Sequence, residues 1–77
     1  MVKIYSTPSC AYCDTLKKFL SSKGISFTDI DVSKDQKYID EMIQKSDQMG
    51  VPVLDIDGNI VIGFDKEKIC KLLNIKE

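Results

Sequence analysis

Two cysteines three positions apart, in the segment Cys10-Ala11-Tyr12-Cys13, are the residues most able to do chemistry in this 77-residue chain. The thiolate form of cysteine is the nucleophile, and a helix N-terminus lowers a thiol pKa because its free N–H groups favour an anion. A second cysteine one helical turn later can attack a disulfide formed on the first. The spacing therefore predicts thiol–disulfide exchange, with Cys10 as the attacking thiol and Cys13 as the resolving thiol.

The same cysteine pair could instead bind a metal ion or be chemically inert. Structural zinc takes four ligands, but the chain offers only one further cysteine, Cys70, and no histidine. Zinc would need an acidic side chain or a second chain to complete its ligands. The lack of histidine also excludes Cys–His proteases and Ser–His–Asp hydrolases. We favour redox chemistry without a metal or organic cofactor, and interpret Cys70 as a half-buried packing residue rather than a regulatory or intermolecular disulfide partner.

The composition is that of one small domain covering residues 1–77, with 43% hydrophobic and 30% charged residues. The net charge is −1 and no basic run occurs, so the charge pattern gives no indication of nucleic-acid binding. The apolar runs are too short to span a membrane, and the first five residues are too short for a signal peptide. We expect a cytoplasmic monomer, and interpret Asp29, Asp31 and Asp35 as a solvated acidic face rather than a calcium site.

Hydrophobic patterning places the cysteine pair between a strand and a helix. The segment 2–5 is rich in strand-forming residues, and Ser9 is a suitable N-cap for a helix over about residues 11–23. Cys13 falls on the apolar face of that helix, which predicts that Cys13 is the more buried sulfur. The other residues of this face are Leu16, Phe19 and Leu20.

The rest of the chain completes an alternating pattern of strands and helices. We expect a strand over 25–32 that ends or bulges at Asp29-Ile30, a helix over 36–45, strands over 53–56 and 59–62, and a helix over 66–74. Ser33 or Asp35 would cap the second helix, Asp65 the last one, and Asp57-Gly58 would form the hairpin turn. The order β-α-β-α-β-β-α predicts an α/β protein with a mixed four-stranded sheet covered by three helices.

Three segments of the chain resemble those of glutaredoxins. The segment from Tyr5 to Cys13 is similar to their active-site segment, Gly50-Val51-Pro52-Val53 to their cis-proline segment, and Gly63-Phe64-Asp65 to the turn that opens their last helix. The segments come in the family's order and spacing and cover essentially the whole chain. The resemblance implies the thioredoxin fold, in agreement with the predicted order of elements.

The resemblance also implies a binding groove beside Cys10. The Val51–Pro52 bond would be cis, so that the Val51 backbone could pair with glutathione or a cysteinyl peptide. Phe64 and Asp65 would bracket the γ-glutamyl end of glutathione at a helix N-terminus, and Tyr12 would shield the sulfurs or stack on the bound peptide. Glutathione would then be a co-substrate, and the partners would be disulfide-containing proteins and a reductase of unknown type.

The chain departs from the glutaredoxin pattern near both cysteines and the proline. Thr7 stands where many glutathione-using members have a basic residue, Ala11 where they often have proline, and Gly50 where they often have threonine. The remaining candidates for holding the glycine carboxylate of glutathione are Lys3, Lys45 and Gln48, although a solvated surface position is the simpler interpretation of each lysine.

Three alternatives to a glutathione-linked enzyme stay open. The pair Gly63-Phe64 also resembles small redoxins that take electrons from thioredoxin reductase and serve ribonucleotide reductase. Outside redox catalysis, the chain could be a non-catalytic binding module that presents a groove. It could also be a metal or Fe–S scaffold built on Cys10, although related scaffolds usually have one active-site cysteine rather than two.

Overall fold

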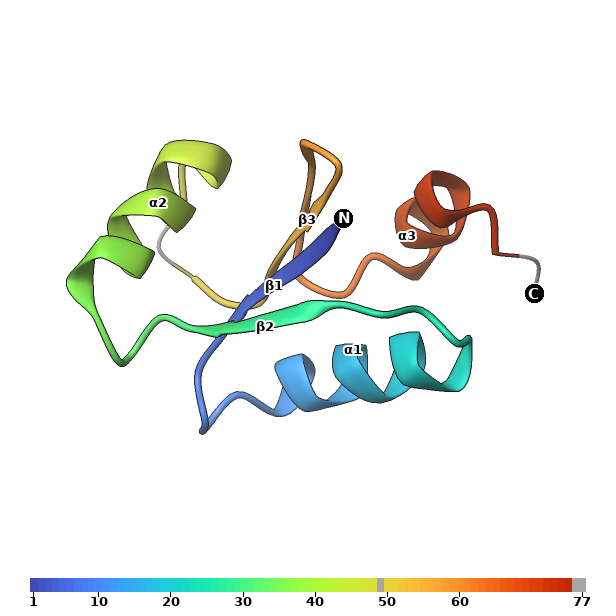
Figure 1. Ribbon diagram of the computed structural model, residues 1–77, viewed down its shortest axis with the longest axis horizontal. Coiled ribbons are helices and arrows are strands. Elements are labelled where there is room, and N and C mark those ends of the chain that lie inside the picture. Colours follow the sequence, from blue (N-terminus) through green and yellow to red (C-terminus); the bar gives the residue numbers. More distant parts are fainter. Residues whose placement is uncertain (49, 76–77) are drawn as a thin grey trace.

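The computed structural model describes residues 1–48 and 50–75, which form four strands and three helices in the predicted order (Figure 1). The strands are β1 (Val2–Ser6), β2 (Thr28–Asp31), β3 (Val53–Ile56) and β4 (Asn59–Ile62), and the helices are α1 (Ala11–Ser22), α2 (Gln36–Ser46) and α3 (Lys66–Leu73). The sheet order is β2-β1-β3-β4. β1 is parallel to β2, whereas the pairs β1–β3 and β3–β4 are antiparallel. The predicted mixed sheet is confirmed.

Helices α1 and α3 cover one face of the sheet and α2 covers the other (Figure 1). Side chains alternate between the two faces of a strand. Within β1, Ile4 therefore packs with the α1 and α3 side, while Tyr5 packs with α2. By the same alternation, Ser6 at the end of β1 faces α1. The larger core lies on the α1 and α3 side and contains Val2, Ile4, Leu16, Leu20, Leu54, Ile56, Val61 and Ile69.

Local sequence signals account for most element boundaries. The Asp35 carboxylate accepts a hydrogen bond from the Lys37 N–H at 3.0 Å and caps α2. Asp57 and Gly58 have φ values of 50° and 92°, as the predicted two-residue hairpin turn requires. Within the described ranges, none of the helices is long and apolar enough to cross a membrane.

The second strand differs from the prediction. It begins at Thr28, close to where the predicted strand over 25–32 was expected to end. Ile25 and Phe27 pack against the larger core from the connection before the strand, so their alternation reflects burial rather than strand pairing. Asp29 does not interrupt the strand but continues its parallel pairing with β1.

A polar network ties α2 to the sheet. The Lys45 ammonium group donates to Asp55 Oδ2 at 2.7 Å and to the Tyr5 hydroxyl oxygen at 3.0 Å. The Tyr5 hydroxyl donates to Glu41 Oε2 at 2.6 Å, and the Gly58 N–H donates to Asp55 Oδ1 at 2.8 Å. Lys45 is therefore not the solvated surface lysine that the sequence suggested, because both of its oxygen partners belong to the sheet.

The network shifts the protonation of its members. Hydrogen bonds to Asp55 and then Tyr5 raise the pKa of Lys45. Burial alone would raise the pKa of Asp55, but the hydrogen bonds from Lys45 and the Gly58 N–H hold it below its usual value. The network therefore favours the charged forms of both Lys45 and Asp55.

Replacing the lysine should weaken the fold. We expect Lys45→Met to lower the free energy of unfolding by about 1–3 kcal/mol, because Asp55 would stay buried without its cation. Urea unfolding at neutral pH measures the change. Lys18→Met, at an exposed position of α1, is the matched control and should change the free energy by less than about 0.5 kcal/mol. Equal losses in the two variants would contradict a stabilising network.

The lowered pKa of Asp55 predicts sensitivity to acid. Because its folded pKa lies below the unfolded value of about 3.8, its ionisation stabilises the fold above that pH. This stabilisation is lost as the pH falls through the folded pKa. We expect the free energy of unfolding to fall below about pH 5 in the unmodified protein, and less steeply in Asp55→Asn. Urea unfolding at a series of acidic pH values tests this, and identical slopes for both proteins would be evidence against it.

Candidate active site

Cys10 is itself the N-cap of α1. Its sulfur accepts a hydrogen bond from the Cys13 N–H at 3.1 Å, and its backbone is extended, with φ −94° and ψ 111°. The prediction of Ser9 as the cap is wrong by one residue, because the cysteine sulfur fills the role that the serine hydroxyl was expected to fill. The first turn of α1 thus directs an N–H group at the Cys10 sulfur, an arrangement that favours the thiolate.

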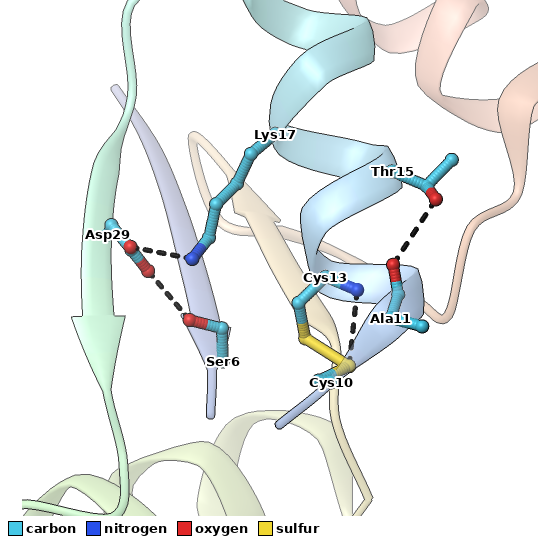
Figure 2. The surroundings of a disulfide bond; sticks show 7 residues. All are labelled: Ser6, Cys10, Ala11, Cys13, Thr15, Lys17 and Asp29. Atoms are coloured by element: carbon cyan, nitrogen blue, oxygen red, sulfur yellow. Dashed lines mark hydrogen bonds and ion pairs between the residues drawn. A yellow bond between two sulfur atoms is a disulfide. The ribbon is translucent and has the colours of Figure 1, made fainter. Parts of the chain in front are cut away.

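The two cysteines form a disulfide across the first turn of α1, with their Cα atoms 5.2 Å apart (Figure 2). Cys13 is fully buried at 0% exposure, whereas Cys10 is half-buried. The predicted difference in burial is confirmed. A partner sulfur approaching from solvent therefore reaches Cys10 before Cys13, in keeping with an attacking and a resolving thiol.

The strand pairing brings the other predicted site segments to the same end of the sheet as Cys10. Tyr5 pairs with Val53, and Val53 pairs with Ile62. The end of β1, the beginning of β3 and the end of β4 therefore lie together. The connections at this end that contain the predicted site residues are residues 7–10, 50–52 and 63–65.

The Val51–Pro52 bond is cis, as the resemblance implied. Pro52 is buried and Val51 is half-buried. The Pro52 carbonyl accepts a hydrogen bond from the Gly63 N–H at 2.9 Å. The proline segment is thereby joined to the turn that leads into α3.

The remaining predicted site residues differ in how far they are available to a partner. Phe64 is half-buried and packs on Phe19 of α1, with ring centroids 5.5 Å apart. The Asp65 carboxylate accepts the Lys68 N–H at 3.2 Å and caps α3, as predicted. Tyr12 is 70% exposed beside Cys10. Tyr12 and Asp65 are thus accessible, whereas much of Phe64 packs against the protein's own core.

Three polar residues beside the disulfide were not identified from the sequence. The Ser6 hydroxyl donates to Asp29 Oδ1 at 2.7 Å, and the Lys17 ammonium lies 2.7 Å from Asp29 Oδ2 (Figure 2). Asp29 is therefore not simply part of a solvated acidic face. One signal was available in the sequence, since Lys17 follows Cys13 by four residues and so shares its helix face.

Other chemistry suggested by the sequence finds less support in the structure. Lys45, a candidate for the glycine carboxylate of glutathione, is engaged with Asp55 and Tyr5. Cys70 is half-buried on α3, as expected. Over residues 1–48 and 50–75, no three cysteine or acidic side chains gather in a way that could hold a metal ion.

Comparison with known proteins identifies the family. The sequence profile described as Glutaredoxin matches residues 2–61, most of the chain. The chain belongs to the glutaredoxin family. A relative from Clostridium pasteurianum, named as an uncharacterized glutaredoxin-like 8.6 kDa protein in a rubredoxin operon, is 52% identical over 95% of this chain and 97% of its own length. The glutaredoxin-like protein NrdH of Lactococcus lactis is 29% identical over 94% of this chain and 99% of its own.

Solved structures support the same assignment. The crystal structure of a mutant of the thioredoxin-like protein BC3987 matches with a TM-score of 0.91 and 33% identity, covering 97% of this chain and 96% of that one. The predicted thioredoxin fold is confirmed. A glutaredoxin-family fold with a cysteine pair at the start of α1 is, in general terms, that of a thiol–disulfide oxidoreductase.

The role of Cys10 as a cap and its expected role as a nucleophile can be separated by substitution. Serine is a good N-cap, so Cys10→Ser should retain the stability of the reduced protein. Cys10→Ala should lower the free energy of unfolding by about 1 kcal/mol, because an N–H group of the first turn loses its acceptor. Urea unfolding under reducing conditions compares the three proteins. Equal stability of the alanine and serine variants would argue against the capping role of the sulfur.

Proposed function

We propose that this glutaredoxin-family protein is a dithiol oxidoreductase that reduces protein disulfides, glutathione mixed disulfides, or both. The single observation that carries the proposal is the pairing of a half-buried Cys10, held at the N-terminus of α1, with a fully buried Cys13 one turn later. A binding module would need neither the pairing nor the capping geometry.

The reaction proceeds in two exchanges. The Cys10 thiolate attacks one sulfur of the substrate disulfide, which breaks that bond, releases one thiolate and leaves a mixed disulfide on Cys10. The Cys13 sulfur then attacks Cys10, so the Cys10–Cys13 bond forms as the bond to the substrate sulfur breaks. Two electrons have passed from the dithiol to the substrate, and an external reductant must restore the thiols. Where the substrate is a glutathione mixed disulfide, free glutathione can perform the second exchange instead.

The groove residues have separate roles in this proposal. The Val51 backbone pairs with the peptide that bears the attacked sulfur, as an added short strand. Asp65 and the N–H groups at the start of α3 receive the γ-glutamyl end of glutathione, with Phe64 beside it. Tyr12, which is 70% exposed, covers the sulfurs or stacks on the bound peptide. We further infer a cytoplasmic, single-domain monomer over residues 1–77 that works without a bound cofactor.

A second candidate is a redoxin that takes electrons from thioredoxin reductase and serves ribonucleotide reductase. The observation that favours it is the engagement of Lys45 with Asp55 and Tyr5, which removes one candidate for the glycine carboxylate of glutathione. Thr7, which stands where many glutathione-using members have a basic residue, also favours this second candidate. The similarity to the NrdH protein of Lactococcus lactis is consistent with this role.

An electron-donor assay distinguishes the two candidates. NADPH consumption is followed with a disulfide substrate, first with glutathione and glutathione reductase, then with thioredoxin reductase alone. We expect turnover in at least one system, and its loss in Cys10→Ser, which preserves the helix cap but not the nucleophile. Turnover with glutathione supports the first candidate, and turnover with thioredoxin reductase alone supports the second. Full activity of Cys10→Ser would contradict the assigned nucleophile.

A further inference from the structure

Three secondary-structure elements contribute one side chain each to a polar cluster beside the disulfide. We define the Asp29 cluster as Ser6 of β1, Lys17 of α1 and Asp29 of β2 (Figure 2). One oxygen of the Asp29 carboxylate accepts from the Ser6 hydroxyl at 2.7 Å, and the other lies 2.7 Å from the Lys17 ammonium. The two-exchange reaction described above does not use any of these side chains.

The cluster lies beside the cysteine pair, on the side of the sheet that α1 covers. Ser6 is the last residue of β1 and faces α1, as Ile4 does. Cys13 lies in the first turn of α1 and is fully buried between that helix and the sheet. The Ser6 side chain and the Cys13 sulfur therefore lie at the same end of the interface between α1 and β1. Figure 2 shows the three side chains of the cluster beside Cys10 and Cys13.

Because Cys13 is buried, its thiol proton needs a route to solvent, and the Asp29 cluster offers one. Cys13 is 0% exposed, so a proton leaving its thiol has no direct contact with water. Ser6 is 2% exposed, but its hydroxyl is bonded to a carboxylate whose side chain is 43% exposed. The hydrogen bond from Ser6 to Asp29 thus leads from the buried interface to solvent. If the cluster served only to hold α1 against β2, the ion pair of Lys17 with Asp29 would suffice without Ser6.

We propose that Ser6 and Asp29 carry the proton of Cys13 to solvent during the resolving exchange, while Lys17 holds the carboxylate in position. This inference rests on the proposed function. The Cys13 thiol gives its proton to the Ser6 oxygen as the Ser6 hydroxyl gives its own proton to Asp29. The resulting Cys13 thiolate attacks the Cys10 sulfur, and the substrate sulfur leaves with the electron pair of the broken bond. Asp29 then releases the proton to water.

Other titratable groups line the surface hollow that includes Asp29. They come from β1, β2, the connection after β2, and α2, and line the same surface hollow: Lys3, Asp31, Lys34, Tyr38 and Glu41. Glu41 is bonded to the Tyr5 hydroxyl on the opposite face of the sheet. Asp31 is bonded to the hydroxyl and the N–H of Ser33. Asp31 lies on the same strand as Asp29 without a bond to Ser6, which makes it the matched control.

The two exchanges can be timed separately with dithionitrobenzoate, an aromatic disulfide that releases a coloured thiolate at each step. Reduced protein carrying Cys70→Ser is mixed with excess reagent, so that only Cys10 and Cys13 react. The first release reports attack by Cys10 and is proportional to reagent concentration. The second release reports resolution by Cys13 and is independent of it. Cys13→Ser identifies the second release by abolishing it.

We expect Asp29→Asn and Ser6→Ala each to slow the second release about tenfold, and to change the first release by less than about twofold. The slowed rate should rise in proportion to hydroxide concentration, because hydroxide must then take the proton. The double variant should be no slower than either single variant, since both act in one path. Asp31→Asn should leave both releases unchanged.

Several outcomes would overturn the inference. An unchanged second release in Asp29→Asn would exclude the carboxylate as the proton acceptor, and equal slowing of both releases would indicate a loosened α1 instead. If Asp29→Asn does not fold, Ser6→Ala decides, because it removes one buried oxygen and leaves the pair of Lys17 with Asp29 in place. If the protein with both cysteines shows no second release, the proposed function itself is contradicted. The comparison among variants tests only the proton path.

Discussion

The hydrogen bond from the Cys13 N–H to the Cys10 sulfur is the interaction on which the rest of the site depends. It makes Cys10, the proposed nucleophile, the N-cap of α1, so the position of the sulfur is fixed by the position of the helix. The helix is in turn fixed by Leu16 and Leu20, which pack against Ile4 of β1. The position of the Cys10 sulfur therefore depends on the apolar core that holds α1 against β1.

The neighbouring residues Tyr5 and Ser6 take part in separate polar networks on the two faces of the sheet. Tyr5 points toward α2 and joins the network of Lys45 and Asp55, whereas Ser6 points toward α1 and joins Asp29. Strand alternation alone produces this division, because neighbouring side chains lie on opposite faces. One network holds α2 against β3, just after the cis-proline segment, and the other lies beside the disulfide. A single strand end thus organises both sides of the active-site region.

The parts of the fold set by local chemistry could be predicted from the sequence. The cysteine pair, the Asp57-Gly58 turn and the caps at Asp35 and Asp65 depend on residues within a few positions of one another. The cap of α1 lies at Cys10 rather than at the predicted Ser9, because the Cys10 sulfur accepts the N–H hydrogen bond although cysteine is not among the usual capping residues.

The polar networks could not be predicted in the same way, because their partners are distant in sequence. Asp29 and Ser6 are 23 residues apart, and Lys45 and Tyr5 are 40 residues apart. No local pattern distinguishes such residues from solvated ones. The start of β2 differs from the prediction for a related reason, since Phe27 packs, partly buried, against the larger core without belonging to a strand. Alternation along a chain reports which side chains are buried, and only the pairing with β1 determines which of them form the strand.

The engagement of Lys45 also bears on how a partner would be recognised. A lysine bonded to Asp55 and Tyr5 would have to give up both bonds to receive a carboxylate, leaving Asp55 partly buried without its cation. Recognition at this end of the sheet would then depend more on the backbone of Val51, on the N-terminus of α3 and on the exposed Tyr12 ring. Backbone pairing and aromatic contact accept many peptide sequences, because they read little of the side chains. In the proposed function, the cysteine pair would therefore define the reaction more narrowly than these contacts would define the substrate.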